Sequence, residues 1–367
     1  MYGNSFGRYL RMTTWGESHQ KAMGVVIDGI PSGLKLSEGD IQREVDRRKP
    51  MQSDITTQRM EEDKIEILSG VFKGKTTGAP LSVVVWNKDV NSSFYERFKD
   101  IPRPGHADLT YRLKYGFYDY RGGGRSSGRE TLCRVIAGAV AKKILSTIGV
   151  RVIAHTVQIE NISLKRKVSF EEIERNIEKN AVRCADLETA KMMEKRIREI
   201  AEKGDSSGGM VEIIATDVPA GLGDPVFNKL DAEIAKALMS IPAVKGVEIG
   251  VGFSAVKMKG SEMNDSYTIK NGKILTKTNN SGGILGGISN GMPIIARIAV
   301  KPTSSIGLKQ KSVNLKTMKE AELEIKGRHD PNITPRIVPV AESMVAFVIA
   351  DFSLASGCVN LYNKDTK

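Results

Sequence analysis

Three of the four histidines lie in polar turns that suit acid–base chemistry. Glycine or proline marks each of these turns, and each histidine has a carboxylate one or two residues away: His19 with Glu17, His106 with Asp108, and His329 with Asp330. Histidine is well suited to transfer a proton or to stabilise a developing anion near neutral pH. A metal site is the rival interpretation, but no pair has helical i,i+4 ligand spacing and arginines closely precede two of the three histidines. We therefore expect an active site and no metal.

A glycine- and arginine-rich stretch, "YRGGGRSSGRETLCRV" at 120–135, predicts an anion site. Ser127 with Glu130 three positions later is a capping-box pattern, so a helix should begin there. The unpaired N–H groups of its first turn attract anions, and Arg125 and Arg129 add full charges. Neither the P-loop pattern nor the dinucleotide-binding glycine pattern fits this stretch. The alternative is a capped helix whose arginines merely face water.

A second glycine-rich segment, "NNSGGILGGISNG" at 279–291, leads into a strand that ends in "KPTSSIG" at 301–307. Several side chains of the second motif could donate hydrogen bonds to a phosphate or to a ring carbonyl: Lys301, Thr303, Ser304 and Ser305. Two ordinary turns would explain the same residues.

Composition limits the classes of protein to consider. The formal net charge is +12, but the basic residues are not gathered in a tail, and many arginines lie beside glycine, serine and histidine. This favours small phosphorylated or carboxylated ligands. A nucleic-acid-binding protein is the competing hypothesis, and the 6% aromatic content and the lack of RNP-like, zinc-finger or basic-helix patterns argue against it.

The cysteines and the apolar runs indicate a reducing, cytoplasmic setting. The 3 cysteines are scattered and encode neither a disulfide framework nor a CxxC site. The N-terminal stretch lacks the apolar core of a signal peptide, and no run of about 18 apolar residues occurs. We therefore expect no membrane partner.

Capping residues predict the starts of several helices, and these helices must position the candidate site residues. Ser37 caps a predicted helix over 38–48, and Ser169 caps another that opens at residue 170. Residues 186–203 read as an amphipathic helix, and Asp224 with Pro225 predicts a further helix start.

Strand-like runs lie between these helices and do not alternate with them in a βαβ rhythm. They are 25–30, 64–72, 81–87, 150–159, 210–218, 293–301 and 344–352. Several are neighbours along the chain, which favours an α+β fold with antiparallel sheets. No linker or repeat interrupts the sequence, so we predict a single domain over residues 1–367.

Eight motifs closely resemble the chorismate synthase family, in a match that runs in order from residue 2 to about residue 352. They are "WGESH", "RPGHAD", "YRGGGRSSGRET", "GDSSGGMVE", "PAGLGDPVFNKLDAEIAKALMSIPAVKGVEIG", "SGGILGGISNG", "KPTSSI" and "GRHDP". The resemblance implies a lyase of the shikimate pathway, in aromatic amino acid biosynthesis, that converts 5-enolpyruvylshikimate 3-phosphate to chorismate and phosphate. The reaction would be a redox-neutral 1,4-anti elimination that requires reduced FMN. The resemblance also implies a homotetramer of sandwich subunits with helices between antiparallel sheets.

The resemblance implies roles for individual residues. His106 would protonate or stabilise the departing phosphate, and His19 would keep the reduced flavin in its productive ionisation state. Ser18 would assist proton relay, and Asp330 would help the flavin act as a base. The substrate anions would be bound by Arg48, Arg103, Arg129 and Arg328. The flavin contacts would be Arg125, Ser126, Ser127, Pro242, Ala243, Gly286, Lys301, Pro302, Thr303, Ser304, Ser305 and Arg328.

Three positions depart from the family pattern. Gln20 stands where glycine is usual, which could alter the turn behind His19, and Pro242 stands where asparagine is common, which puts that flavin contact in doubt. Asp54 replaces a usual arginine, so an arginine linked to phosphate or NADP binding is missing or is supplied by Arg59. We therefore expect NADPH to act only indirectly, as the reductant of an external flavin reductase. The same aspartate argues against a third hypothesis, that the protein is itself a flavin reductase.

Overall fold

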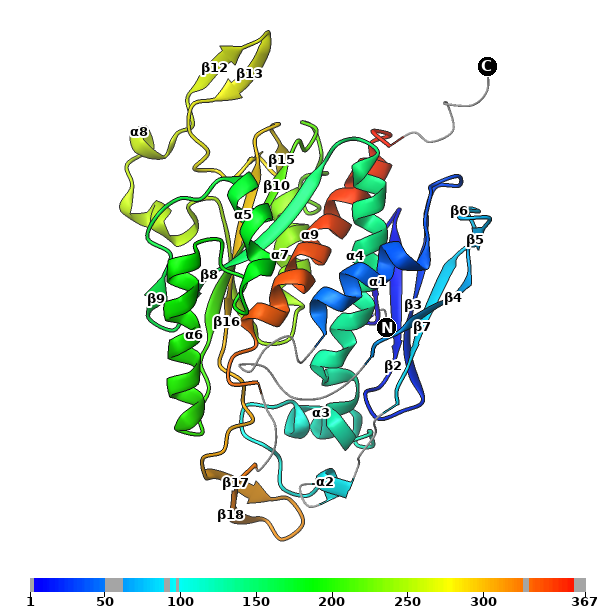
Figure 1. Cartoon of the computed structure of the whole chain (residues 1–367), viewed down its shortest axis with the longest axis vertical. Coiled ribbons are helices and arrows are strands. Elements are labelled where there is room, and N and C mark those ends of the chain that lie inside the picture. Colours follow the sequence, from blue (N-terminus) through cyan, green and yellow to red (C-terminus); the bar gives the residue numbers. More distant parts are fainter. Residues whose placement is uncertain (1–2, 50–61, 89–92, 97–98, 326–329, 360–367) are drawn as a thin grey trace.

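The chain folds into two antiparallel sheets with helices packed between them (Figure 1). The computed structural model describes residues 3–49, 62–88, 93–96, 99–325 and 330–359. The arrangement confirms the predicted α+β class. The single-domain organisation stays a prediction.

The first sheet has the strand order β1-β2-β3-β7-β4, with every neighbouring pair antiparallel. Its strands are β1 (Ser5–Phe6), β2 (Arg11–Gly16), β3 (Ala22–Asp28), β7 (Leu81–Trp86) and β4 (Ile65–Ser69). The central strands, "AMGVVID" and "LSVVVW", are rich in β-branched residues, which suit a pleated, half-buried surface. The predicted strand over 64–72 is interrupted at Gly70, after which β5 (Val71–Phe72) pairs with β6 (Lys75–Thr76).

The second sheet has the order β11-β16-β10-β8-β9. Its strands are β11 (Val244–Ile249), β16 (Ile294–Val300), β10 (Gly209–Thr216), β8 (Arg151–Ile159) and β9 (Ile162–Ser163). Along β10, Val211, Ile213 and Ala215 are buried and alternate with half-buried residues. That period of two directs one face of the sheet towards the helices.

Four helices fill the space between the sheets: α1 (Glu38–Arg48), α4 (Thr131–Ser146), α7 (Leu230–Met239) and α9 (Thr334–Ala355). α4 and α9 lie side by side along the centre of the molecule (Figure 1). A Cβ atom added at Gly138 of α4 would lie 2.1 Å from the Cβ of Ser343 on α9, so the two helices can approach this closely only with glycine there. On the outer face of the second sheet, α5 (Phe170–Asn176) and α6 (Leu187–Glu202) pack on β8.

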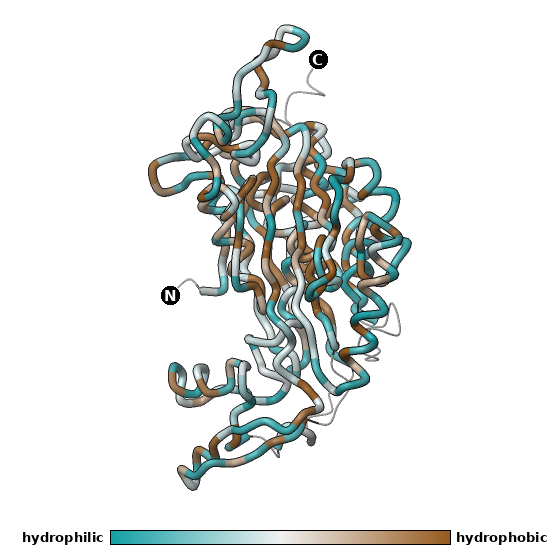
Figure 2. The backbone as a smooth tube through the Cα atoms, turned by 90° about the vertical axis from the view of Figure 1, so that its left-hand side faces the viewer, coloured by the Kyte–Doolittle hydropathy of each residue, from teal (hydrophilic) through white to brown (hydrophobic). Residues whose placement is uncertain are grey.

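The remaining elements project from the ends of this body (Figure 1). They are α2 (Ser93–Glu96), α3 (Asp108–Tyr115), α8 (Gly260–Met263) and the hairpins β12–β13 (Tyr267–Lys270, Lys273–Thr276) and β17–β18 (Gln310–Asn314, Lys319–Leu323). The hairpin β14–β15 (Ile284–Leu285, Ile288–Ser289) instead packs on α7, with Ile284 in the core. Figure 2 shows hydrophobic stretches gathered along the strands of the body, whereas the projecting parts mix hydrophilic and hydrophobic residues.

Two predicted elements are wrong. Residues 344–352 form no strand, because they belong to α9, which is buried between the sheets and therefore lacks an amphipathic period. α9 is also the one helix within the described residues that is long and apolar enough to cross a membrane, but most of it is buried inside the protein. The helix predicted from Asp224 begins only at Leu230, because Asp224 and Asn228 close a turn through two backbone hydrogen bonds. The predicted helices α1, α5 and α6 are confirmed, each with its expected start.

Candidate active site

One cavity of about 480 Å³ gathers most of the predicted site residues. It lies where α1 ends, where α4 and α9 begin, and where the chain leaves β16. The predicted residues that line it are Ser18, His19, Arg48, Arg103, His106, Ser126, Ser127, Arg129, Pro242, Ala243, Lys301, Pro302, Thr303, Ser304, Ser305 and Asp330. Segments far apart in the sequence therefore meet around a single space.

The glycine loop before α4 is packed directly on His19. Gly122 has a φ of 60°, and a Cβ atom there would lie 2.1 Å from Cδ2 of His19 and 2.6 Å from Oγ of Ser18. The Ser18 hydroxyl donates a hydrogen bond to the carbonyl of Gly122 at 3.2 Å. Only glycine leaves room for this contact, so the loop fixes the position of the histidine turn.

The start of α4 differs in detail from the predicted capping box. Ser127 does cap the first turn, a 3₁₀ turn over Gly128–Glu130, by accepting from the N–H of Arg129. Glu130 does not complete the box, because its carboxylate instead accepts from the Thr14 hydroxyl at 2.9 Å and from Arg134 at 2.8 Å.

His106 is bound by a residue 199 positions away. Its Nε2 atom lies 2.8 Å from the hydroxyl of Ser305, in the loop that follows β16. Asp108, the carboxylate that the sequence places beside His106, binds Arg103 through two hydrogen bonds of 2.8 Å. Burial alone would raise the pKa of Asp108, but the hydrogen bonds and charge of Arg103 outweigh it and lower this pKa.

Arg48 and Arg129 share one buried carboxylate. Asp63 accepts from Nη1 of Arg129 at 2.9 Å and from Nη1 of Arg48 at 3.4 Å. Arg48 also donates to the Thr131 hydroxyl at 3.1 Å. Burial, followed by the positive charge of Arg336, lowers the pKa of Arg48 to about 10. Both guanidinium groups are thus fixed with little freedom before a ligand arrives.

Lys301 and Asp330 form the rest of the charged lining. Nζ of Lys301 donates to the Gly105 carbonyl at 3.1 Å and to the Ser304 hydroxyl. Burial, and secondly the charge of Lys245, lowers the pKa of Lys301. The carboxylate of Asp330 accepts from Nη1 of Arg336 at 2.6 Å.

Two predicted flavin contacts do not line this cavity. The guanidinium of Arg125 donates to the Gly16 carbonyl at 3.1 Å and to the Thr14 hydroxyl at 2.7 Å, which turns it into an adjoining cavity of about 570 Å³. The two cavities share Ser126 and Pro242. Gly286 lies in the turn of the β14–β15 hairpin. The Arg125 side chain therefore lines the adjoining cavity and not the one that holds His106, because carbonyl and hydroxyl oxygens hold its guanidinium there, and its role as a flavin contact stays a prediction.

Four positions named in the sequence analysis lie outside the described residues: Asp54, Arg59, Arg328 and His329. Gln20, the departure behind His19, donates from its amide to Asp119 at 2.7 Å. It therefore ties the histidine turn to the chain just before the glycine loop. Within the described ranges, no group of three or more His, Cys, Asp or Glu side chains is placed to hold a metal ion.

Sequence reasoning missed two cavity residues of functional interest, Arg336 and Tyr95. The His19 ring meets Tyr95 edge-on, with centroids 5.0 Å apart. Arg336 follows Pro335 in the first turn of α9. A proline at a helix start is the available signal, but the apolar run that follows it resembles a strand and hides the helix.

Comparison with known proteins gives one consistent family. A family model described as chorismate synthase matches residues 10–354. The chain is 59% identical over 360 residues to the chorismate synthase of Methanosarcina barkeri, covering 98% of each protein. It is 55% identical over 370 residues to that of Methanocaldococcus jannaschii, covering 97% of this chain and 98% of the relative. A crystal structure of a chorismate synthase matches with a TM-score of 0.78 and 35% identity, over 96% of this chain and 93% of that one.

Proposed function

The chain belongs to the chorismate synthase family, and we propose that it performs the family reaction with reduced FMN bound in the 480 Å³ cavity. Family membership makes it a lyase of aromatic amino acid biosynthesis that eliminates phosphate from 5-enolpyruvylshikimate 3-phosphate. The proposed course is a 1,4-anti elimination that gives chorismate without net oxidation. One observation carries this assignment: Arg48, His106, Lys301 and Asp330, from four distant segments, line one cavity.

The wall from Lys301 to Ser305 suits a flavin. Family membership implies a flavin cofactor. The ammonium group of Lys301 and the hydroxyls of Thr303 and Ser304 are donors that match the carbonyl and phosphate oxygens of FMN. The cavity volume falls within the roughly 300–1,000 Å³ common for small-molecule sites. Reduced FMN, when bound, supplies transient electron density and takes up a substrate proton.

The remaining walls suit the substrate, which carries a phosphate and two carboxylates. Arg48, Arg103 and Arg129 present guanidinium groups that are already held by Asp63 or Asp108. Fixed cations of this kind stabilise negative charge that develops on a leaving group, and they need no reorganisation when the reaction occurs. Arg328 keeps its proposed role from the family resemblance alone.

Three side chains are assigned to proton transfer. His106 protonates or stabilises the departing phosphate, and its contact with Ser305 fixes the direction of the ring. His19, held between Gly122 and Tyr95, maintains the ionisation state of the cofactor, with Ser18 as a relay. Asp330, held by Arg336, supports removal of the substrate proton.

We extend the proposal to the setting of the enzyme. We expect a cytoplasmic homotetramer supplied with reduced flavin by an external reductase, because Asp54 stands where the family has an NADP-linked arginine. Sedimentation should give four times the chain mass of 40.1 kDa. NADPH should not be consumed by the protein and FMN alone.

An anaerobic assay tests the proposed function. The protein with chemically reduced FMN and 5-enolpyruvylshikimate 3-phosphate should form chorismate and phosphate in equal amounts. His106→Ala should lower kcat by about 10²–10⁴-fold, the usual range for loss of a general acid or base. Binding of oxidised FMN to the variant should be kept, which separates lost chemistry from lost structure. Absence of chorismate with folded, flavin-bound wild-type protein would refute the proposal.

A further inference from the structure

The motif "GDSSGG" at 204–209 lies next to the cavity without lining it. It forms the connection between α6 and β10, and residues 204–208 are called the serine turn below. Ser206 is half-buried, and Ser207 is buried with 3% of its surface exposed. Buried hydroxyl groups are hydrogen-bonded in folded proteins, so their partners show what this turn supports.

The serine turn supports the cavity wall formed by residues 301–305. The hydroxyl of Ser206 donates a hydrogen bond to the carbonyl of Thr303 at 2.7 Å. Gly208 lies so close to the strand before this wall that a Cβ atom there would be 2.4 Å from the carbonyl oxygen of Val300. The 301–305 wall is thus held from outside the cavity, where a ligand does not reach.

Asn332 fixes the serine turn to the start of α9. Its amide nitrogen lies 2.9 Å from the hydroxyl of Ser207, and 3.0 and 3.1 Å from the carbonyl oxygens of Ser207 and Gly208. Its amide oxygen accepts from the backbone N–H of Thr334, the first residue of α9, at 2.8 Å. Only 1% of Asn332 is exposed, so water does not compete for these hydrogen bonds.

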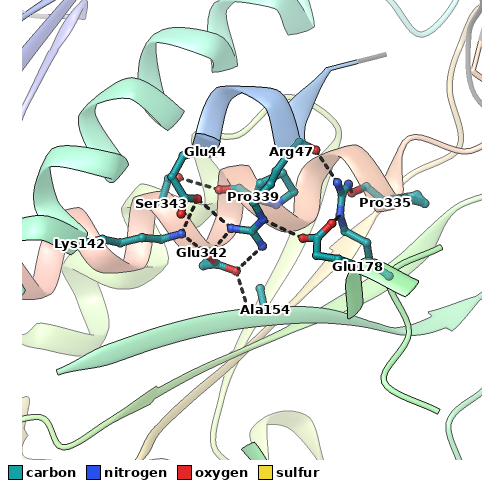
Figure 3. A network of polar contacts seen from close by, with 10 residues as sticks. Glu44, Arg47, Lys142, Ala154, Glu178, Pro335, Pro339, Glu342 and Ser343 are labelled. Atoms are coloured by element: carbon teal, nitrogen blue, oxygen red, sulfur yellow. Dashed lines mark hydrogen bonds and ion pairs between the residues drawn. The ribbon is translucent and has the colours of Figure 1, made fainter. Parts of the chain in front are cut away.

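α9 is itself fixed inside the protein (Figure 3). The carboxylate of Glu342 accepts from Arg47 of α1 at 2.8 and 3.2 Å and from Lys142 of α4. It also accepts from the backbone N–H of Ala154 in β8 at 3.0 Å. Glu44 pairs with both cations, and Glu342, Arg47, Lys142 and Glu44 together form the Glu342 cluster. The helix that Asn332 joins to the serine turn is therefore a firm support.

The 301–305 wall contacts two groups that the proposed function assigns to proton transfer. The hydroxyl of Ser305 lies 2.8 Å from Nε2 of His106. The hydroxyl of Thr303 donates to the backbone carbonyl of Asp330 at 2.8 Å. A shift of this wall would therefore move the surroundings of both groups at once.

We propose that Ser206 and Asn332 are positioning residues, which hold the 301–305 wall and thereby set the spacing between His106 and Asp330. This rests on the proposed function, in which His106 acts on the departing phosphate and Asp330 supports removal of the substrate proton. In a 1,4-elimination these two events occur at opposite ends of the same part of the substrate, so the spacing of the two groups must fit it. Ser206 and Asn332 do not line the cavity and act only through their neighbours.

Hydrogen–deuterium exchange of the protein without cofactor tests the support of the wall. Ser206→Ala removes the hydroxyl that holds the Thr303 carbonyl. The backbone amides of residues 301–307 should then exchange about three- to tenfold faster, as expected for the loss of one neutral hydrogen bond. Ser206→Thr keeps a hydroxyl group and should exchange within about twofold of the wild type.

The matched control is Ser69→Ala. It removes a similar hydrogen bond, from a serine hydroxyl to the Pro80 carbonyl at 2.9 Å, in β4 at the edge of the first sheet. This variant should leave the exchange of residues 301–307 and the activity unchanged.

The anaerobic assay tests the consequence for the reaction, with kcat stated per site that binds oxidised FMN. Ser206→Ala should lower kcat by about tenfold and leave KM for 5-enolpyruvylshikimate 3-phosphate within about twofold, because displaced proton-transfer groups slow the reaction more than they weaken binding. Ser206→Thr should recover most of kcat. Asn332→Asp keeps the acceptor for the N–H of Thr334 and loses the amide donors, so it should lower kcat in the same way. If Asn332→Asp does not fold, the two Ser206 variants decide alone.

The inference is overturned if residues 301–307 exchange in Ser206→Ala as they do in the wild type. It is also overturned if their exchange is faster but kcat stays within about twofold, or if Ser206→Thr recovers neither quantity. If exchange responds as expected but the wild type makes no chorismate, the support of the wall stands and the proposed function fails. If the wild type makes chorismate and neither exchange nor kcat responds to Ser206→Ala, only the positioning role fails.

Discussion

Gly122, a residue without a side chain, lies directly against the His19 ring. Any Cβ there would come within 2.1 Å of the ring. The sequence explains why three glycines occur in a row: each of Gly122, Gly123 and Gly124 has a positive φ, which other residues adopt at a cost. The loop therefore serves both the backbone path and the placement of a proposed proton-transfer group.

Replacing Gly122 with alanine should displace His19. We expect kcat to fall by about tenfold or more, because the added methyl group takes the space of the imidazole. Gly116→Ala is the matched control, since Gly116 has a φ of 69° and open space around its Cβ position. Both variants carry the backbone strain, but only the first meets the histidine. Equal activity in the two variants would show that the contact with His19 does not matter.

At single positions, local motifs predicted the residue types around the cavity but not all of their partners. The "KPTSSIG" motif predicts that Lys301 and Ser305 donate to a ligand, and the structure adds that Ser305 also meets His106. That pairing joins two loops 199 residues apart, so no local pattern could reveal it. Asp108 was expected beside His106 but binds Arg103, because a guanidinium offers it two charged donors at once.

Among the elements, α9 shows where sequence patterns fail. A helix enclosed by two sheets and α4 is apolar on nearly all sides, so its 3.6-residue period disappears and a short part of it resembles a strand. α1, α5 and α6 keep polar faces and cap residues, and were predicted correctly. Neighbouring strand runs predict antiparallel sheets, whereas the pairing of β3 with β7, separated by α1, β4, β5 and β6 along the chain, required the tertiary structure.

The crossing of α4 and α9 should tolerate no added methyl group. Gly138→Ala would place a Cβ atom 2.1 Å from the Cβ of Ser343, so the helices must separate. We expect a loss of about 1–3 kcal/mol in the free energy of unfolding, measured with urea. Gly39→Ala in α1 is the control, since its nearest neighbour is 3.7 Å away. That change should gain about 0.5–1 kcal/mol, as alanine favours helix. Stability equal to the wild type for Gly138→Ala would contradict the close crossing.

The Glu342 cluster should make stability depend on acid pH. Burial would raise the pKa of Glu342, but the charges and hydrogen bonds of Arg47 and Lys142 outweigh it and lower the pKa from 4.5 to about 2. A carboxyl with a depressed pKa in the folded state stabilises the protein above its unfolded pKa. That stabilisation is lost as the pH falls from 4.5 towards about 2.

Glu342→Gln should remove this dependence. At pH 7 the variant removes the buried carboxylate shared by Arg47 and Lys142, although Glu44 still pairs with both cations. We therefore expect a loss of roughly 1.5–3 kcal/mol in the free energy of unfolding, the usual contribution of a hydrogen bond to a charged group. The measurement is unfolding in urea at neutral pH and near pH 3. The difference between wild type and variant in the free energy of unfolding should become smaller as the pH falls. Glu188→Gln, at an exposed pair with Lys191, should follow the wild type at both values. If this difference in the free energy of unfolding stays constant with pH, an ionised Glu342 does not stabilise the fold.

In the whole molecule, the two-sheet sandwich brings the ends of several helices and strands to one place. α1 contributes Arg48, the loop before α4 contributes Ser127, and the segment after β16 contributes Lys301. The fold class could be predicted from the sequence, and the meeting point of these segments came only from the family resemblance. Strand order and helix packing decide which loops become neighbours, and neither is encoded locally.

A structure of the protein with oxidised FMN and 5-enolpyruvylshikimate 3-phosphate tests the central claim most directly. The account predicts both molecules in the single cavity, with the flavin along Lys301 to Ser305 and the phosphate group of the substrate among the arginines near Arg48. Density for either molecule elsewhere, for example in the adjoining cavity beside Arg134, with this cavity left to solvent, would contradict it.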